Sequence, residues 1–182
     1  MTISGSTEPF IRPEKFWCAL GLRANQTVAH LGCGAGFYII PAAKIVGHKG
    51  QVIGVDVLPD MLQEVEGRAR REGVDDIVRT VRANLENKRG STLKKDIADW
   101  TLVANILYQS DPVKILREAA RVTKPGGTII IVEWDIISTP LGPPVETRVS
   151  QSQVLALAEK IKLKFSDEFN PSPYHYGLLL AV

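Results

Sequence analysis

The chain has 182 residues, the usual size of one domain, and 45% of them are hydrophobic, which is enough to build a sizeable core. Its 22 Lys and Arg residues against 20 Asp and Glu leave a formal net charge of +2, too small to indicate nucleic acid or an anionic membrane as partner. No apolar run approaches the roughly 20 residues that cross a bilayer.

The beginning of the chain and its cysteines indicate a compartment. The first ten residues lack the basic start and apolar stretch of a secretory signal peptide, so we expect a cytoplasmic protein. Cys18 and Cys33 are the only cysteines, and no Cys-x-x-Cys or Cys/His cluster occurs, so we expect a reduced protein without a metal site.

Short β-branched runs alternate along the chain with segments of helical spacing, which is the pattern of βαβ units. The runs lie at residues 27–31, 51–55, 77–83, 98–104 and 128–133. Before the first run, residues 12–21 have apolar side chains at helical spacing. The second run is followed by a predicted helix of about fourteen residues, with Pro59 in its first turn and Gly73 at its end.

The next predicted helix begins at Asp111 as N-cap with Pro112 at its first position, and residues 124–127 close it. Prolines 140, 143 and 144 then mark an irregular connection. In residues 160–165, apolar side chains alternate with lysines, which predicts a half-buried strand near a sheet edge, its lysines blocking edge-to-edge association. Residues 176–182 form a last predicted strand.

Nearly continuous apolar strands such as residues 129–132 need cover on both faces, so we predict a doubly wound α/β fold. The whole chain, residues 1–182, is expected to be one domain. Its parts are an N-terminal segment and helix at 1–22 that covers the site, a cofactor-binding core at 23–135, and C-terminal strands on the substrate side at 136–182.

The most informative stretch is a strand that runs directly into glycines at every second position, Gly32, Gly34 and Gly36. Glycines at such a turn let a ligand lie against the backbone near a helix N-terminus. A dinucleotide fingerprint needs its third glycine at position 37, where this chain has Phe37, so a smaller nucleoside ligand is favoured. A tight turn without ligand is the alternative.

Two polar residues follow the next two strands. Asp56 ends the second strand, where a carboxylate accepts hydrogen bonds from both ribose hydroxyls. Asn84 ends the third, where its amide pairs with an adenine edge beside the apolar Leu85. Each residue alone is also compatible with a helix cap, but all three sites lie at the strand ends where open α/β sheets bind ligands.

These residues resemble the class I S-adenosylmethionine-dependent methyltransferases. The matching stretches are residues 30–36, 54–56, 83–84, 98–107 and 123–128, which together span about residues 27–135. Within the family, the chain is similar to small members near the quinone-biosynthesis and arsenite methyltransferases. The resemblance implies a seven-stranded sheet with its last strand antiparallel, and S-adenosyl-L-methionine as cofactor.

The resemblance also implies that the glycine loop contacts the methionine part, Asp56 the ribose and Asn84 the adenine. The full set of expected cofactor contacts is His30, Gly32, Cys33, Gly34, Gly36, Asp56, Val57, Met61, Asn84, Leu85 and Asn105. The family usually has an acid where this chain has His30. Because a protonated imidazole would repel the cofactor's positive charges, we expect affinity to weaken as pH falls through the imidazole range.

Candidate acceptor-side residues follow the fourth and fifth strands. Tyr108, Gln109 and Trp134 are expected to contact the substrate, and Tyr108, Glu133 and His175 are the candidates for a catalytic base. The alternatives are that Tyr108 and Trp134 plug the top of the sheet, that Glu133 pairs with an arginine, and that His175 is a surface residue. Arsenite is disfavoured as acceptor because Cys33 lies in the cofactor loop.

The sequence therefore predicts methyl transfer to a small-molecule acceptor by in-line displacement. The alternatives are a catalytically silent S-adenosylmethionine-binding or scaffold protein and a nucleotide-dependent oxidoreductase. Nucleic acid is disfavoured as acceptor because basic and aromatic residues do not interleave in the loops. Closure of the site by the N-terminal segment, by a second subunit in a homodimer or by a large substrate stays open.

Overall fold

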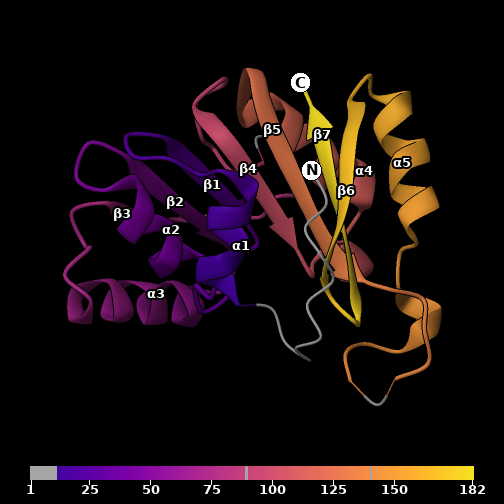
Figure 1. Ribbon diagram of the computed structural model, residues 1–182, viewed down its shortest axis with the longest axis horizontal. Coiled ribbons are helices and arrows are strands. Elements are labelled where there is room, and N and C mark those ends of the chain that lie inside the picture. Colours follow the sequence, from indigo (N-terminus) through magenta and orange to yellow (C-terminus); the bar gives the residue numbers. More distant parts are fainter. Residues whose placement is uncertain (1–11, 89, 140) are drawn as a thin grey trace.

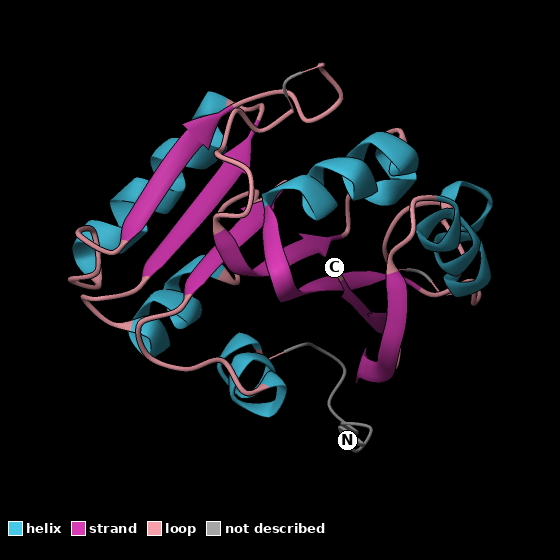
Figure 2. Ribbon diagram, turned by 90° about the horizontal axis from the view of Figure 1, so that it is seen from above, coloured by secondary structure: helices cyan, strands magenta, loops and turns pink. Residues whose placement is uncertain are grey.

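Seven strands form one mixed sheet with helices on both faces in a computed structural model that describes residues 12–88, 90–139 and 141–182 (Figures 1 and 2). The helices are α1 (Pro13–Leu20), α2 (Ile39–Val46), α3 (Pro59–Arg71), α4 (Pro112–Val122) and α5 (Gln151–Lys160), with 3-10 turns η1 (Leu107–Gln109) and η2 (Val145–Thr147). The strands are β1 (Thr27–Leu31), β2 (Gln51–Asp56), β3 (Val78–Arg82), β4 (Ala98–Ala104), β5 (Thr123–Trp134), β6 (Lys164–Ser172) and β7 (His175–Ala181).

The strand order is β3-β2-β1-β4-β5-β7-β6. The first five strands in this order pair in parallel, while β7 runs antiparallel to both β5 and β6. The predicted doubly wound sheet of seven strands, with the last strand antiparallel, is confirmed. The order reverses between β1 and β4, which is where open α/β sheets form their ligand crevice.

Two hydrophobic cores lie on opposite faces of the sheet, because successive strand side chains point to opposite sides. Residues of one parity pack with α1, α2 and α3: Val28, Val52, Leu102 and Ile130. Residues of the other parity pack with α4 and α5: Ala29, Ile53, Val103 and Ile131. The alternation explains why these strands read as nearly continuous apolar runs.

The two helices with the clearest sequence signals lie where they were predicted. Helix α3 has Pro59 in its first turn, and Gly73 follows its end with a φ of +65°. The side chain of Asp111 caps α4 by accepting hydrogen bonds from the backbone N–H groups of Val113 and Lys114, at 3.0 and 3.3 Å. The strand after α4 is longer than predicted, because β5 begins at Thr123 and includes residues 124–127.

The predicted strand at 160–165 is wrong in position. Helix α5, capped at Ser150, runs to Lys160, and its end is closed by the N–H of Leu163 donating to Ala158 O at 3.0 Å. Lys162 has a φ of +65°, so the chain turns here before β6 begins. Ile161 and Leu163 thus follow the helix and join the core beneath it, whereas Phe165 is exposed in β6, which does occupy the sheet edge.

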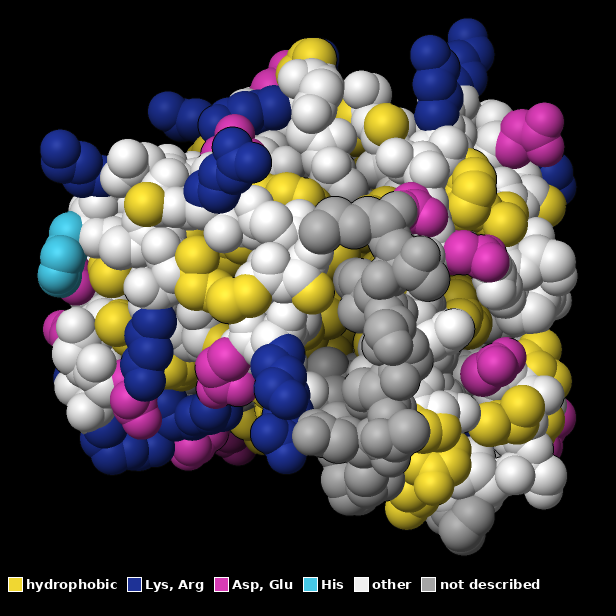
Figure 3. Space-filling view, in the orientation of Figure 1, with side chains coloured by type: hydrophobic (Ala, Val, Ile, Leu, Met, Phe, Trp, Pro, Cys, Tyr) yellow, Lys and Arg dark blue, Asp and Glu magenta, His cyan; other side chains and the backbone are white. Residues whose placement is uncertain are grey.

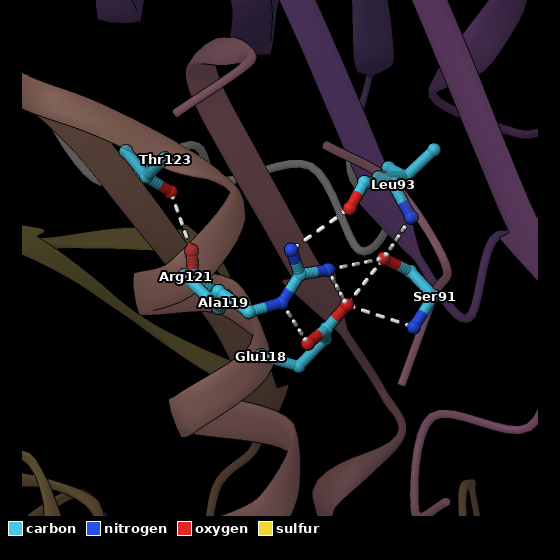
Figure 4. Close-up of polar contacts among 6 residues, drawn as sticks. All are labelled: Ser91, Leu93, Glu118, Ala119, Arg121 and Thr123. Carbon is cyan, nitrogen blue, oxygen red and sulfur yellow. Dashed lines mark hydrogen bonds and ion pairs between the residues drawn. The ribbon is translucent and has the colours of Figure 1, made fainter. Parts of the chain in front are cut away.

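A polar network anchors the connection between β3 and β4 to helix α4 (Figure 4). The buried carboxylate of Glu118 accepts hydrogen bonds from the backbone N–H and hydroxyl of Ser91 and forms an ion pair with Arg121, whose Nη2 lies 2.6 Å from Oε1. Arg121 also donates to Leu93 O at 2.8 Å. This connection begins with Asn84 and Leu85, so the network stabilises the segment that carries two expected cofactor contacts.

Helix α1 packs its aromatic side chains against the segment after the glycine loop. Trp17 is fully buried, and its indole Nε1 donates to Tyr38 O at 2.9 Å. Phe16 contacts the Tyr38 ring at a centroid distance of 4.9 Å. Residues 1–22 were expected to cover the cofactor site, and half of them, residues 1–11, lie outside the described residues. Within the described chain, no helix has the length and apolar character needed to cross a membrane.

Candidate functional site

A cavity of about 1060 Å³ opens at the C-terminal ends of the parallel strands. The ends of β1, β2, β3, β4 and β5 contribute to its wall, and the start of β7 closes the far end. The volume lies at the top of the range of about 300–1,000 Å³ that small-molecule sites span. The cavity therefore has room for a nucleoside cofactor together with a small acceptor.

The three glycines of the loop do different things. Gly32 has a φ of +75°, and a Cβ at this position would overlap the Ile106 side chain. Gly34 has a φ of +50° and faces open space. Gly36 does not line the cavity; a Cβ there would lie 2.8 Å from Val65 Cγ2 on α3. Gly36 thus packs against α3, and the cofactor contact expected at this glycine stays a prediction.

The backbone N–H groups of the loop already have partners within the protein. Gly32 and Cys33 donate to Val55 O at 2.8 and 3.0 Å, and Gly36 donates to Cys33 O at 3.0 Å. Gly34 donates to Asp56 Oδ2 at 2.8 Å. A pyrophosphate needs such N–H groups free, so the arrangement argues against the oxidoreductase alternative.

Asp56, the expected ribose contact, lines the cavity at the end of β2. Besides Gly34, it accepts a hydrogen bond from the Leu58 N–H at 3.0 Å, while α3 itself begins without a side-chain cap. Asn84 also lines the cavity, and its Oδ1 accepts the Glu86 N–H at 2.9 Å, so it does not cap a helix. Val57, Met61 and Leu85 line the cavity as well.

Cys33 lines the cavity as a buried thiol and Cys18 is exposed on α1. Burial, followed by the negative charge of Asp56, raises the pKa of the Cys33 thiol to about 12. The thiol therefore stays protonated at neutral pH and is a poor metal or arsenic ligand.

His30 and Tyr38 form a buried, uncharged pair in the cavity wall. The His30 side chain is 3% exposed and its ring meets that of Tyr38 edge to face at 5.7 Å. Burial lowers the pKa of His30 to about 3. The expectation that His30 would make cofactor affinity weaken through the usual imidazole range is therefore wrong, because the ring stays neutral from pH 5.5 to 8.

Three of the residues expected on the acceptor side, Gln109, Trp134 and His175, also line the cavity. The His175 ring stacks on Trp134 at a centroid distance of 4.1 Å, and its Nδ1 lies 2.8 Å from Ser172 Oγ. Burial and then the charge of Arg148 lower the pKa of His175 to about 4. His175 is thus a neutral cavity residue, which removes the alternative of a surface histidine.

Arg148 fastens the connection from β5 to α5, which forms part of this wall. Its guanidinium is buried and donates to the carbonyl oxygens of residues 135, 137, 141 and 143 at 2.8 to 3.0 Å. It also lies 5.4 Å from the centroid of the Trp134 ring. The connection thereby holds Leu141 against the cavity beside Trp134.

Two acceptor-side candidates lie elsewhere. Tyr108 is in η1 but does not line the cavity. Glu133 is 1% exposed, also outside the wall, and accepts hydrogen bonds from the backbone N–H groups of Ile106 and Leu107. Within the described residues no arginine pairs with this carboxylate, which supports the turn after β4, and the role of Glu133 as a base stays a prediction.

Several residues that line the cavity were not predicted as cofactor or substrate contacts from the sequence. They are Phe37, Tyr38, Arg68, Glu86, Leu141 and Tyr174. Phe37 and Tyr38 directly follow the glycine loop, so their closeness to it in the sequence could have predicted that both line the cavity. Arg68 reaches the cavity from the third turn of α3, where its Nη1 donates to Ala35 O at 2.9 Å, and no local pattern predicts that contact.

The hydrogen-bonding state of the wall indicates a polar ligand. Within the described residues, five buried side-chain atoms have no hydrogen-bond partner, namely His30 Nδ1 and Nε2, Tyr38 Oη, Asn105 Oδ1 and His175 Nε2. All belong to residues that line this cavity. Buried polar groups are normally paired, so these atoms fit a ligand with several hydrogen-bonding groups, as S-adenosylmethionine has.

Known proteins agree with this fold. The family described as methyltransferase domain matches residues 22–168. The ubiquinone/menaquinone biosynthesis C-methyltransferase of Bdellovibrio bacteriovorus is 31% identical over 66% of this chain and 49% of its own length. The Vibrio vulnificus enzyme of that name is 33% identical over 69% of this chain and 46% of its own.

The chain thus spans about half the length of the curated relatives that it matches. Among solved structures, a SAM dependent methyltransferase from Aquifex aeolicus superimposes with a TM-score of 0.85 at 27% identity, covering 94% of this chain and 90% of that one. The chain belongs to the methyltransferase domain family, and within it to the class I S-adenosylmethionine-dependent methyltransferases.

Proposed function

We propose that this chain transfers a methyl group from S-adenosyl-L-methionine to a small-molecule acceptor by in-line displacement. The observation that carries the proposal is the set of unpartnered polar atoms, all of which belong to residues that line one cavity at the strand ends. Their spread over both ends of a cavity of about 1060 Å³ favours two ligands side by side. A silent binding protein needs no polar group at the acceptor end.

The proposed cofactor end lies between the glycine loop and Asn84. When bound, S-adenosylmethionine supplies an electrophilic methyl group. Gly34 leaves room for the ligand against the backbone, Asp56 accepts hydrogen bonds from the ribose hydroxyls, and Asn84 pairs with the adenine edge. Neutral His30 and the Tyr38 hydroxyl are placed to accept hydrogen bonds from the cofactor's amino group without adding charge.

The proposed acceptor end lies between Gln109, Trp134, Leu141 and His175. His175 presents an unpartnered Nε2 in a neutral ring whose Nδ1 contacts Ser172 Oγ. We propose that Nε2 accepts a hydrogen bond from the acceptor's nucleophilic atom and so orients that atom for in-line transfer. Hydrophobic side chains of Ile136, Ile137 and Leu141 are exposed on the β5–α5 connection and favour an acceptor with an apolar part. Figure 3 shows hydrophobic side chains at the lower right of this face, where Figure 1 draws that connection.

Two measurements test this function. Calorimetry should show binding of S-adenosylmethionine and S-adenosylhomocysteine and none of NAD. Release of S-adenosylhomocysteine should then be followed with a panel of phenols, thiols, amines and quinone precursors. Turnover of any of them supports the proposal, whereas tight binding with no product across the panel favours the silent protein, and no binding rejects both.

Gly34 and Gly36 should respond differently to the same substitution. Gly34→Ala is expected to weaken S-adenosylhomocysteine binding at least ten-fold while costing only the ~1 kcal/mol of a left-handed alanine, since its Cβ meets no protein atom. Gly36→Ala should cost about 2–3 kcal/mol of unfolding free energy, because its Cβ also crowds Val65. Urea unfolding and calorimetry measure both; equal losses of stability would contradict the assignment.

A further inference from the structure

Glu133 is a buried carboxylate that holds a backbone turn. It ends β5 and is 1% exposed, and its Oε1 accepts hydrogen bonds from the N–H groups of Ile106 and Leu107, each at 2.7 Å. Two N–H donors on one carboxylate oxygen fix the turn between β4 and η1 relative to β5. The turn needs such support, because Asn105 at its start has a φ of +54° without being glycine.

The same turn forms part of the cavity wall. Asn105, Ile106 and Gln109 all line the cavity, and Asn105 Oδ1 is one of its unpartnered atoms. The Ile106 side chain also lies directly against Gly32, so close that a Cβ there would overlap it. A shift of this turn would therefore move the glycine loop's support and a polar cofactor contact together.

The surroundings of Glu133 supply little charge compensation. On β7, Tyr176 lies opposite Glu133 in the strand register, and its hydroxyl donates to Val149 O at 2.7 Å. Directly after β5, Asp135 is a second carboxylate two residues along the chain, exposed to solvent, and η1 after the turn carries the titratable Tyr108. No ion pair joins Glu133 to a Lys or Arg within the described residues.

We propose that Glu133 is a positioning residue: its ionised carboxylate holds the turn in the binding conformation, so cofactor affinity falls as pH drops through neutrality. The proposal rests on the proposed function, because it concerns the same cofactor site. Burial raises the pKa of Glu133 to about 7, against which the N–H groups of Leu107, Ile106 and Trp134 act. Above this pH the charged form accepts the stronger hydrogen bonds, and below it the neutral acid holds the turn less tightly.

Linkage gives this proposal a second readout. If ionised Glu133 favours binding, then binding must favour ionised Glu133, so the complex forms with release of protons near pH 7. Because a buried acid with a raised pKa costs folding stability in its ionised form above its unfolded pKa, a neutral glutamine should be tolerated by the fold. A glutamate that only stabilised the fold would produce neither the pH-dependent affinity nor the release of protons on binding.

The experiment is calorimetry of S-adenosylhomocysteine binding at pH 6.0, 7.0 and 8.5, repeated at pH 7.0 in buffers of different ionisation enthalpy. For the wild-type chain we expect affinity about three- to five-fold weaker at pH 6.0 than at pH 8.5, with protons released at pH 7.0. Glu133→Gln should bind at the weaker level at every pH and release fewer protons. Asp135→Asn, which neutralises the exposed neighbour, should behave as wild type.

The outcomes separate this proposal from the proposed function. A flat wild-type profile, or a wild-type slope and proton release retained in Glu133→Gln, overturns the role of Glu133 while leaving the cofactor site intact. Loss of the slope in Asp135→Asn would assign the effect to the wrong carboxylate and also overturns it. Failure of the wild-type chain to bind S-adenosylhomocysteine at any pH rejects the proposed function itself.

Discussion

Asp56→Ala is expected to weaken S-adenosylhomocysteine binding about 30- to 150-fold, corresponding to about 2–3 kcal/mol. The substitution removes the carboxylate that is proposed to accept two hydrogen bonds from the ribose. It also removes the acceptor for the Gly34 N–H, so the glycine loop loses its tie to β2. Both losses act in the same direction on affinity, and calorimetry at pH 8 measures their sum.

Two further variants separate the contributions at Asp56. Asp56→Asn keeps an acceptor for the Gly34 N–H but loses the charge, so its affinity should lie between wild type and Asp56→Ala. Asp60→Ala removes an exposed carboxylate four residues later, in the first turn of α3, and should bind as wild type. Unchanged affinity in Asp56→Ala would mean that the ribose lies elsewhere.

Glu118→Ala is expected to lower the free energy of unfolding by about 3–5 kcal/mol, the cost of breaking a buried ion pair from one side. The substitution leaves the buried Ser91 N–H and the half-buried Arg121 guanidinium without their shared carboxylate. Urea unfolding at pH 7 measures the loss. Glu118→Gln should cost less, and Glu159→Ala, at an exposed position of α5, should cost little.

The pH dependence of Glu118 provides a check on the mechanism. Burial alone would raise the pKa of this carboxyl, but the hydrogen bonds from Arg121 and Ser91 outweigh burial and hold the pKa below its usual value. The network therefore contributes stability above the unfolded-state pKa, and that contribution is lost as pH falls through the lower folded-state pKa. Wild type and Glu118→Ala should accordingly converge in stability in acid, and a constant difference would contradict this account.

Local chemistry explains which parts of the site could be predicted from the sequence. The glycine loop, Asp56 and Asn84 each stand at the end of a recognisable strand, and parallel topology brings strand ends to one edge. Glu133 also ends a strand, but which way its side chain faces depends on the turn after β4, 27 residues earlier. The direction of that carboxylate is a tertiary contact, and no spacing in the sequence reveals it.

The error at residues 160–165 has a similar cause. Alternation of apolar and lysine side chains over six residues fits a strand, but it also fits the last turn of a helix followed by a left-handed residue at Lys162. The capping box at Ser150 and Gln153 was the competing local signal, and it shows where α5 begins. At His30 the sequence shows the residue type, but the burial of the side chain depends on the tertiary structure and could not be predicted.

The clamp formed by Arg148 separates two tasks within one small domain. One guanidinium donates hydrogen bonds to four carbonyl oxygens between residues 135 and 143. The conformation of this connection is therefore held by contacts within the connection itself and not by the glycine loop or Asp56. Residues 136–142 should therefore be exchangeable for other sequences as long as Arg148 is retained. We expect such an exchange to change which acceptors the protein binds and to leave the affinity for the nucleoside cofactor unchanged.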